Sequence, residues 1–191
     1  MFITIYGINN IGKSTHCELL VNNLKSMGHE AMFIKYPVYD IHPSGPHLNH
    51  TLRAPKQTIT EEELQLWFVL NRHQFQKSLR NYLEKGIIVV AEDYIGTGIA
   101  WGLAKGADQR WLEEVNKNLI KEDLSILING ERAMHAVEEE HIHESQDELM
   151  DHVRKNLLIL AEQHGWHKVE LQPHKKDTQV LIFDIVKQQL S

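Results

Sequence analysis

The clearest chemical signal in the sequence is the stretch GINNIGKST at positions 7–15. It fits the pattern Gly-x-x-x-x-Gly-Lys-Ser/Thr, in which successive backbone N–H groups and the lysine hold the phosphates of a nucleoside triphosphate. We therefore expect Lys13 to reach the β- and γ-phosphates and the Ser14 hydroxyl to bind Mg²⁺. The other loop residues expected to contact the triphosphate are Gly7, Asn10, Ile11, Gly12 and Thr15.

Two adjacent carboxylates, Glu92 and Asp93, follow the apolar run at 87–91. Such a run is typical of a buried parallel strand, and ligands of open α/β sheets bind at the carboxyl ends of these strands. A carboxylate there could orient a metal ion or take the proton of an attacking hydroxyl. Glu92 and Asp93 are therefore candidate catalytic residues beside Lys13. The alternative is a solvated acidic pair at the end of a strand.

Phe68 and Arg72 are four residues apart within the stretch LWFVLNR. On a helix this spacing places both side chains on one face. The ring could stack on a nucleobase while the guanidinium bonds the edge of that base. The alternative is a core phenylalanine beside an arginine that forms a surface ion pair.

Apolar runs and amphipathic stretches alternate along the chain. The predicted strands lie at 2–6, 31–36, 87–91, 124–128 and 166–171. The predicted helices lie at 13–27, 48–53, 61–85, 96–105, 108–121 and 177–190. A further helix is expected to open at the capping box 145–148 and to run to Gly165.

This alternation predicts an α/β protein, because repeated strand–helix–strand units build a parallel sheet covered by helices on both faces. We expect a single domain over 1–191 with a five-stranded parallel sheet. The polar and acidic segment 130–144 is either a surface loop or a mobile lid.

Composition and charge argue against several other classes of protein. The formal net charge is −6 and no long run of Lys or Arg is present, so nucleic-acid binding is not expected. No apolar stretch approaches the ~20 residues of a membrane span, so no membrane association is expected. The one cysteine, Cys17, permits no intrachain disulfide, which fits a protein of the reducing cytoplasm.

Taken together, these segments make the chain resemble the thymidylate kinases. The resemblance covers essentially the whole sequence, from the phosphate-binding stretch through the pair Tyr36-Pro37, the LWFVLNR stretch, Glu92-Asp93-Tyr94 and the run at 123–128. It implies a P-loop NTPase fold and transfer of the γ-phosphate of ATP to dTMP, giving dTDP, with ATP and Mg²⁺ as cofactors. It also implies a homodimer that packs through helices, such as the long one at 61–85.

The resemblance assigns further residues to the acceptor site. Phe68 and Arg72 would take the base, Asn9 would face the sugar 3′-hydroxyl, and Ser14 would hold the Mg²⁺. The other residues that the resemblance places around the acceptor are Pro37, Thr97, Gly98 and Trp101.

The chain departs from the family pattern at two phosphate-contacting positions. Asp93 stands where the family usually carries arginine, and Tyr39 stands where another arginine follows the proline. The cations that could compensate are Lys35, His42, Arg53, Arg72 and Arg132. Two alternatives therefore remain beside a monophosphate kinase. One is a deoxynucleoside kinase that uses Glu92 or Asp93 as base on a 5′-hydroxyl, and the other is a nucleotide-binding protein with little turnover.

Overall fold

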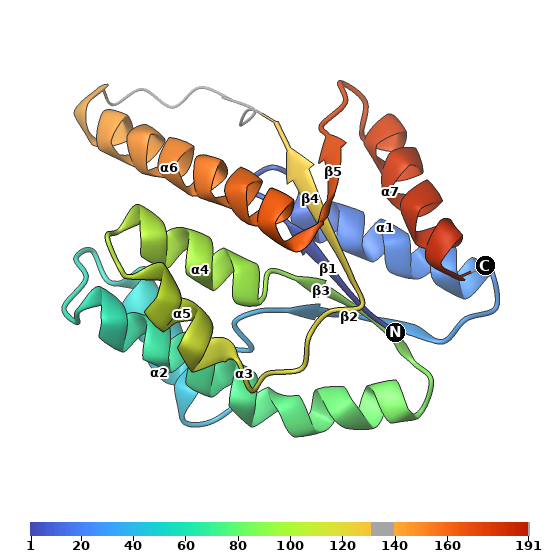
Figure 1. Ribbon diagram of the computed structural model, residues 1–191, viewed down its shortest axis with the longest axis horizontal. Helices are drawn as coiled ribbons and strands as arrows, with labels where there is room; N and C mark the ends of the chain where they lie inside the picture. The colour runs from blue at the N-terminus through green and yellow to red at the C-terminus, as the bar shows by residue number, and fades with distance from the viewer. Residues whose placement is uncertain (131–139, 191) are drawn as a thin grey trace.

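A five-stranded parallel sheet forms the centre of the computed structural model, which describes residues 1–130 and 140–190 (Figure 1). The strand order is β2-β3-β1-β4-β5. The bounds are β1 (Phe2–Tyr6), β2 (Ala31–Lys35), β3 (Ile88–Glu92), β4 (Leu124–Asn129) and β5 (His167–Glu170). This arrangement confirms the predicted α/β sheet and its strands to within two residues at each end.

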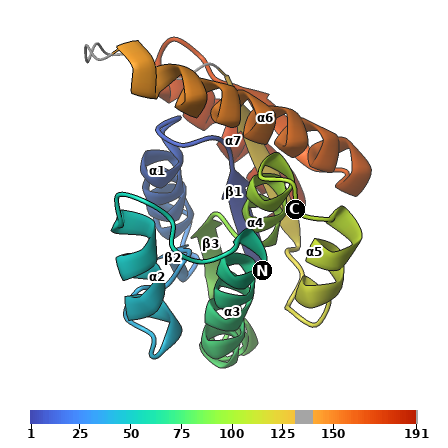
Figure 2. The same ribbon diagram turned by 90° about the vertical axis from the view of Figure 1, so that its left-hand side faces the viewer.

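Helices cover both faces of the sheet. The bounds are α1 (Lys13–Ser26), α2 (Ser44–Arg53), α3 (Glu61–Glu84), α4 (Ile95–Ala104), α5 (Gln109–Asn116), α6 (Glu140–His164) and α7 (Lys175–Leu190). Helices α1 and α7 contact each other on one face, whereas α4 packs against α3, α5 and α6 on the other (Figures 1 and 2). Among the described helices, none is both long and apolar enough to cross a membrane.

Two helix ends differ from the prediction because contacts distant in sequence determine them. Helix α5 ends at Asn116, not near residue 121. Beyond that helix, the Gln76 side chain of α3 accepts a hydrogen bond from the Ile120 N–H (2.7 Å). Helix α2 begins at Ser44, where the Ser44 hydroxyl bonds the Gln74 side chain of α3 (2.5 Å).

Helix α6 begins at Glu140, so the predicted capping box at 145–148 lies inside it and the prediction of a helix start there was wrong. Glutamate, glutamine and serine are compatible with a helix interior, so a local capping pattern does not force a helix to begin. Of the predicted lid at 130–144, residues 131–139 lie outside the described residues and 140–144 belong to α6.

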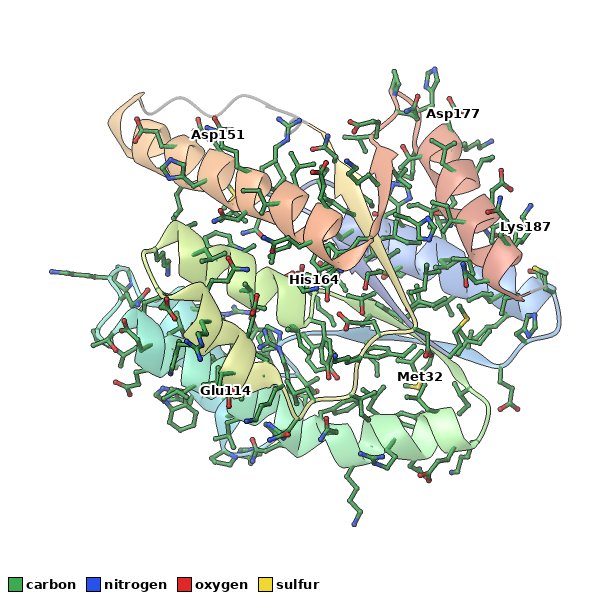
Figure 3. All side chains as sticks on the ribbon, in the orientation of Figure 1. Met32, Glu114, Asp151, His164, Asp177 and Lys187 are labelled. Carbon is green, nitrogen blue, oxygen red and sulfur yellow. The ribbon has the colours of Figure 1, made fainter. Side chains whose placement is uncertain are left out.

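Strands β1 and β3 are buried along their whole length, and side chains fill the space between the sheet and its two helix layers (Figure 3). At one end of β1 the Tyr6 and Trp166 rings are stacked, with centroids 4.3 Å apart. Helix α4 passes so close to this stack that a Cβ on Gly96 would overlap the Trp166 ring and lie 3.1 Å from Tyr6 Cζ. Because Gly96 has no side chain, α4 can approach the sheet this closely.

We expect Gly96→Ala to lower the free energy of unfolding by about 1–3 kcal/mol, because the added methyl group overpacks a filled contact. Urea unfolding followed by circular dichroism measures the change. Trp166→Leu removes the ring that the methyl group would meet, so the double variant should lose less than the sum of the single losses. Strictly additive losses would contradict the overlap.

Candidate active site

A cavity of about 980 Å³ opens at the carboxyl ends of β1 and β3. It brings together most of the residues that the sequence predicts to act in catalysis or binding. Those that line it are Asn9, Asn10, Gly12, Lys13, Ser14, Thr15, Pro37, Phe68, Arg72, Glu92, Asp93, Thr97, Gly98 and Trp101. The triphosphate-binding stretch and the proposed base-binding pair therefore share one cavity.

The loop at 7–12 curls around the Lys13 side chain. The Lys13 ammonium donates to the carbonyl oxygens of Gly7 and Ile8, both at 2.9 Å. A Cβ on Gly7 would lie 2.9 Å from Ile11 Cγ2 and 3.0 Å from the Ile128 carbonyl oxygen, so only glycine fits at the first position of the loop. Ile11 is buried in the core, and neither Gly7 nor Ile11 lines the cavity. The predicted contacts of these two residues with the triphosphate would therefore have to come from backbone atoms, and they stay predictions.

Glu92 connects the loop to two strands of the sheet. One carboxylate oxygen accepts from the Ser14 hydroxyl (2.5 Å) and the other from the Lys35 ammonium (2.8 Å). Lys35 and Glu92 lie side by side in the parallel register of β2 and β3. Partial desolvation acts to lower the pKa of Lys35, but the hydrogen bond and charge of Glu92 outweigh it, and the pKa is raised.

Asp93 adopts a backbone conformation that is rare for a residue other than glycine, with φ of 61°. Its Oδ1 accepts from the Thr97 hydroxyl (2.6 Å), and its Oδ2 lies 3.8 Å from the Lys13 ammonium. Burial raises the pKa of the Asp93 carboxyl, and the charge of Lys13 opposes this rise. The turn after β3 thus aims a desolvated carboxylate at the lysine of the triphosphate loop.

Arg72 is buried at the other end of the cavity, with 4% of its surface exposed. Its guanidinium donates to the Tyr94 carbonyl oxygen (2.8 Å) and to Asn116 Oδ1 (3.0 Å). The guanidinium carbon lies 5.9 Å from the centroid of the Phe68 ring, as expected for two residues on one face of α3. Gly98 leaves the room for this placement, because a Cβ there would lie 2.6 Å from Arg72 Nη2.

The structure describes four of the five cations that could replace the missing arginines. Lys35 and Arg72 line the cavity, whereas Arg53 and His42 do not, and Arg132 lies outside the described residues. The predicted role of Arg53 in the acceptor site is therefore not supported. Its neighbour Leu52 lines the cavity instead, and successive residues on a helix point in directions about 100° apart.

Sequence reasoning missed a polar group beside the base-binding pair. Glu61 and Gln65 line the cavity together with Lys105 of the segment after α4. Glu61 accepts from Gln65 Nε2 (2.7 Å) and forms an ion pair with Lys105 (3.0 Å). The sequence did contain a signal for this group, because Glu61 and Gln65 precede Phe68 and Arg72 at helical spacing and so lie on the same face of the helix.

Comparison with known proteins now identifies the family. The thymidylate kinase family model matches residues 5–182. The chain belongs to the thymidylate kinase family. It is 30% identical to the probable thymidylate kinase of Thermococcus onnurineus, over 85% of this chain and 84% of that one. It is 28% identical to the Schizosaccharomyces pombe thymidylate kinase, over 84% and 77% of the two chains.

The fold is similar to that of solved thymidylate kinases. The structure from Candida albicans matches with a TM-score of 0.83 at 22% identity, covering 98% of this chain and 91% of that one. Membership confirms the predicted P-loop NTPase fold. It also confirms the prediction of an ATP-dependent phosphotransferase that converts dTMP to dTDP, the reaction of this family.

We expect Gly98→Ala to raise the KM for dTMP about tenfold, because the added methyl group displaces the Arg72 guanidinium and weakens a charge-assisted contact of roughly 1.5–3 kcal/mol. Steady-state kinetics with dTMP as the varied substrate measure the effect, and the KM for ATP should change less than about twofold. Gly102→Ala is the control on the same helix, because its Cβ meets mainly the Leu112 side chain (2.8 Å). An equal rise in both variants would contradict the role of Gly98.

Proposed function

We propose that the cavity binds ATP through the loop at 7–15 and dTMP between Phe68, Arg72 and Trp101, and that it joins the two for direct transfer of the γ-phosphate. The observation that supports this most strongly is the shared cavity, which contains both the buried Lys13 ammonium and the Phe68–Arg72 pair. Phosphoryl transfer depends mainly on positioning and on neutralising charge. A site that places the two substrates end to end provides the positioning.

The residues around Ser14 fit a magnesium ion. P-loop enzymes hold Mg²⁺ through the loop Ser or Thr together with a carboxylate at the end of a neighbouring strand, and the oxygen donors of Ser14 and Glu92 suit a hard cation. These donors already lie 2.5 Å from each other. When bound, Mg²⁺ supplies positive charge to the triphosphate, and Ser14 and Glu92 would fix where that charge lies.

Lys13 would provide the second neutralising charge. Its ammonium donates to the Gly7 and Ile8 carbonyl oxygens, which hold it inside the loop. We propose that one of these bonds is exchanged for the β- and γ-phosphate oxygens when ATP binds. The lysine then compensates the charge that develops on the transferring group.

Lys35 is our choice for the cation that meets the phosphate of dTMP. It lines the cavity, and its side chain is 53% exposed, so it can move without breaking core packing. It shares Glu92 with Ser14, so it stands beside the proposed metal position. Lys35 would thus supply positive charge to an acceptor site in which Tyr39 and Asp93 stand where the family usually carries arginines.

Chromatographic assay of dTDP formation from ATP, Mg²⁺ and dTMP tests the proposal. The wild-type chain should form dTDP, and Lys13→Ala should lose at least about 1,000-fold in kcat, since removal of a charge aimed at the transition state costs several kcal/mol. Thermal melting verifies that the variant is folded. A folded wild-type chain that forms no dTDP would refute the proposed function.

Lys35→Ala should raise the KM for dTMP about tenfold, because one charge-assisted contact of roughly 1.5–3 kcal/mol to the acceptor phosphate is lost. The KM for ATP should change by less than about threefold. Lys35→Arg should restore most of the affinity, and Lys25→Ala, on the exposed side of α1, is the matched control. An unchanged KM for dTMP in Lys35→Ala would exclude this residue as the phosphate contact.

We further propose that two copies of the chain pack through α3 and that the protein works in the cytoplasm. Leu66 and Leu70 are four residues apart on α3 and are 49% and 40% exposed, which gives a second copy an apolar stripe to cover. The buried thiol of Cys17, the one cysteine of the sequence, fits a reducing compartment.

Leu66→Glu combined with Leu70→Glu should convert the dimer to monomers at micromolar concentration, because burying two unpaired carboxylates in the interface is costly. Sedimentation velocity measures the mass of the particle. Val180→Glu, at an exposed position on α7, is the control and should leave the mass unchanged. A wild-type chain that sediments as a monomer would contradict the proposed dimer.

A further inference from the structure

The carboxylates of the cavity neutralise its lysines. The pairs are Lys35 with Glu92 (2.8 Å), Lys105 with Glu61 (3.0 Å) and Lys13 with Asp93 (3.8 Å). Among the described residues that line the cavity, Arg72 is the one cation without a carboxylate within ion-pair distance, and it lies on the base side. The three lysines of the cavity are therefore balanced by its three carboxylates, and a neutral acceptor group needs no positive charge beyond this balance.

Asp93 lies where a neutral hydroxyl acceptor would need a base. The Oδ1 atom is fixed by the Thr97 hydroxyl (2.6 Å), whereas the Oδ2 atom has no hydrogen bond among the described residues and lies 3.8 Å from the Lys13 ammonium. Lys13 is the residue that the motif predicts to meet the γ-phosphate of ATP. A carboxylate oxygen at this distance from Lys13 is within reach of an oxygen that attacks the γ-phosphorus.

The backbone supports a specific role for this side chain. Asp93 has φ of 61°, a conformation that costs of order 1 kcal/mol or more for a residue with a Cβ. Residues held in such conformations cluster at active sites, where the surrounding structure fixes them. Here the conformation turns the carboxylate toward Lys13 and Thr97, away from the solvent that an exposed acidic residue would face.

We propose that the cavity also phosphorylates the 5′-hydroxyl of thymidine, with Asp93 as the general base. This activity rests on the proposed function, because the same Phe68–Arg72 pair would hold the base. The 5′-oxygen forms a bond to the γ-phosphorus of ATP while the bond from that phosphorus to the β–γ bridging oxygen breaks. ADP leaves with the bridging oxygen, and the hydroxyl proton passes to Asp93 Oδ2. The product, dTMP, is then the acceptor for the family reaction in the same cavity.

The test measures dTMP and dTDP by chromatography, with either thymidine or dTMP as acceptor, in one preparation made in a host that lacks thymidine kinase. Wild-type chain should form dTMP from thymidine at a rate at least tenfold above Lys13→Ala purified in parallel. The analogue 5′-deoxythymidine, which has no 5′-oxygen, should give no phosphorylated product.

Asp93→Asn identifies the base. It should lower kcat/KM for thymidine at least about 100-fold, since a general base contributes roughly 10²–10⁴, and raise the ratio of dTMP to thymidine activity at least tenfold. Asp108→Asn, which keeps a capping side chain at the start of α5, is the matched carboxylate-to-amide control.

Three results would overturn the inference. Formation of dTDP from dTMP without any dTMP from thymidine would refute the nucleoside activity and leave the proposed function standing. An equal fall in kcat/KM for thymidine and for dTMP in a folded Asp93→Asn variant would show that Asp93 is a positioning residue and not the base. Failure of both acceptors in a folded wild-type chain would refute the proposed function as well.

Discussion

The hydrogen bonds of Glu92 are the constraint on which the rest of the site depends. This one carboxylate binds the Ser14 hydroxyl at the start of α1 and the Lys35 ammonium at the end of β2. Glu92 is itself the last residue of β3, so three neighbouring elements are joined at a single buried group. A buried carboxylate is stable only when its hydrogen bonds are satisfied. The parallel register of β2 and β3 meets this requirement by placing Lys35 beside Glu92. Glu92 in turn fixes Ser14, so the side of the proposed triphosphate site next to the loop at 7–12 is rigid.

The two ends of the cavity differ in how firmly their cations are held. Arg72 is buried, fixed by Tyr94 and Asn116, and Gly98 leaves just enough room for it. Lys35 is about half exposed, with Glu92 as its charged partner. A base held by a preorganised group loses little entropy on binding, whereas a phosphate held by a half-exposed lysine is bound less selectively. This asymmetry favours strict selection of the base, and it favours acceptance of either a phosphate or a hydroxyl group at the 5′ position of the sugar.

Local patterns in the sequence were sufficient to predict the sheet, the triphosphate loop and the Phe68–Arg72 pair, because each depends on spacing within one element. Apart from the start of α6, the failures concern contacts between elements. Arg53 and Leu52 are equally compatible with helix α2, and only the packing of α2 on α3 decides which of them faces the cavity. The end of α5 depends on Gln76 in another helix, and Lys105 reaches the cavity through its pairing with Glu61. Such partners are distant in sequence and leave no periodic signal.

The replacement of arginine by Asp93 changes the electrostatics of the site beyond the loss of one cation. An arginine and an aspartate differ by two charges, and this difference stands next to the Lys13 ammonium. The charge of Asp93 offsets that of Lys13, so the loop carries less positive potential than its lysine alone would give. In the proposed function this carboxylate lies beside the transferring phosphate, where it either repels an acceptor dianion or accepts a proton from an acceptor hydroxyl. By our proposal, aspartate at this position therefore weakens the binding of a monophosphate and also supplies the base that a nucleoside requires.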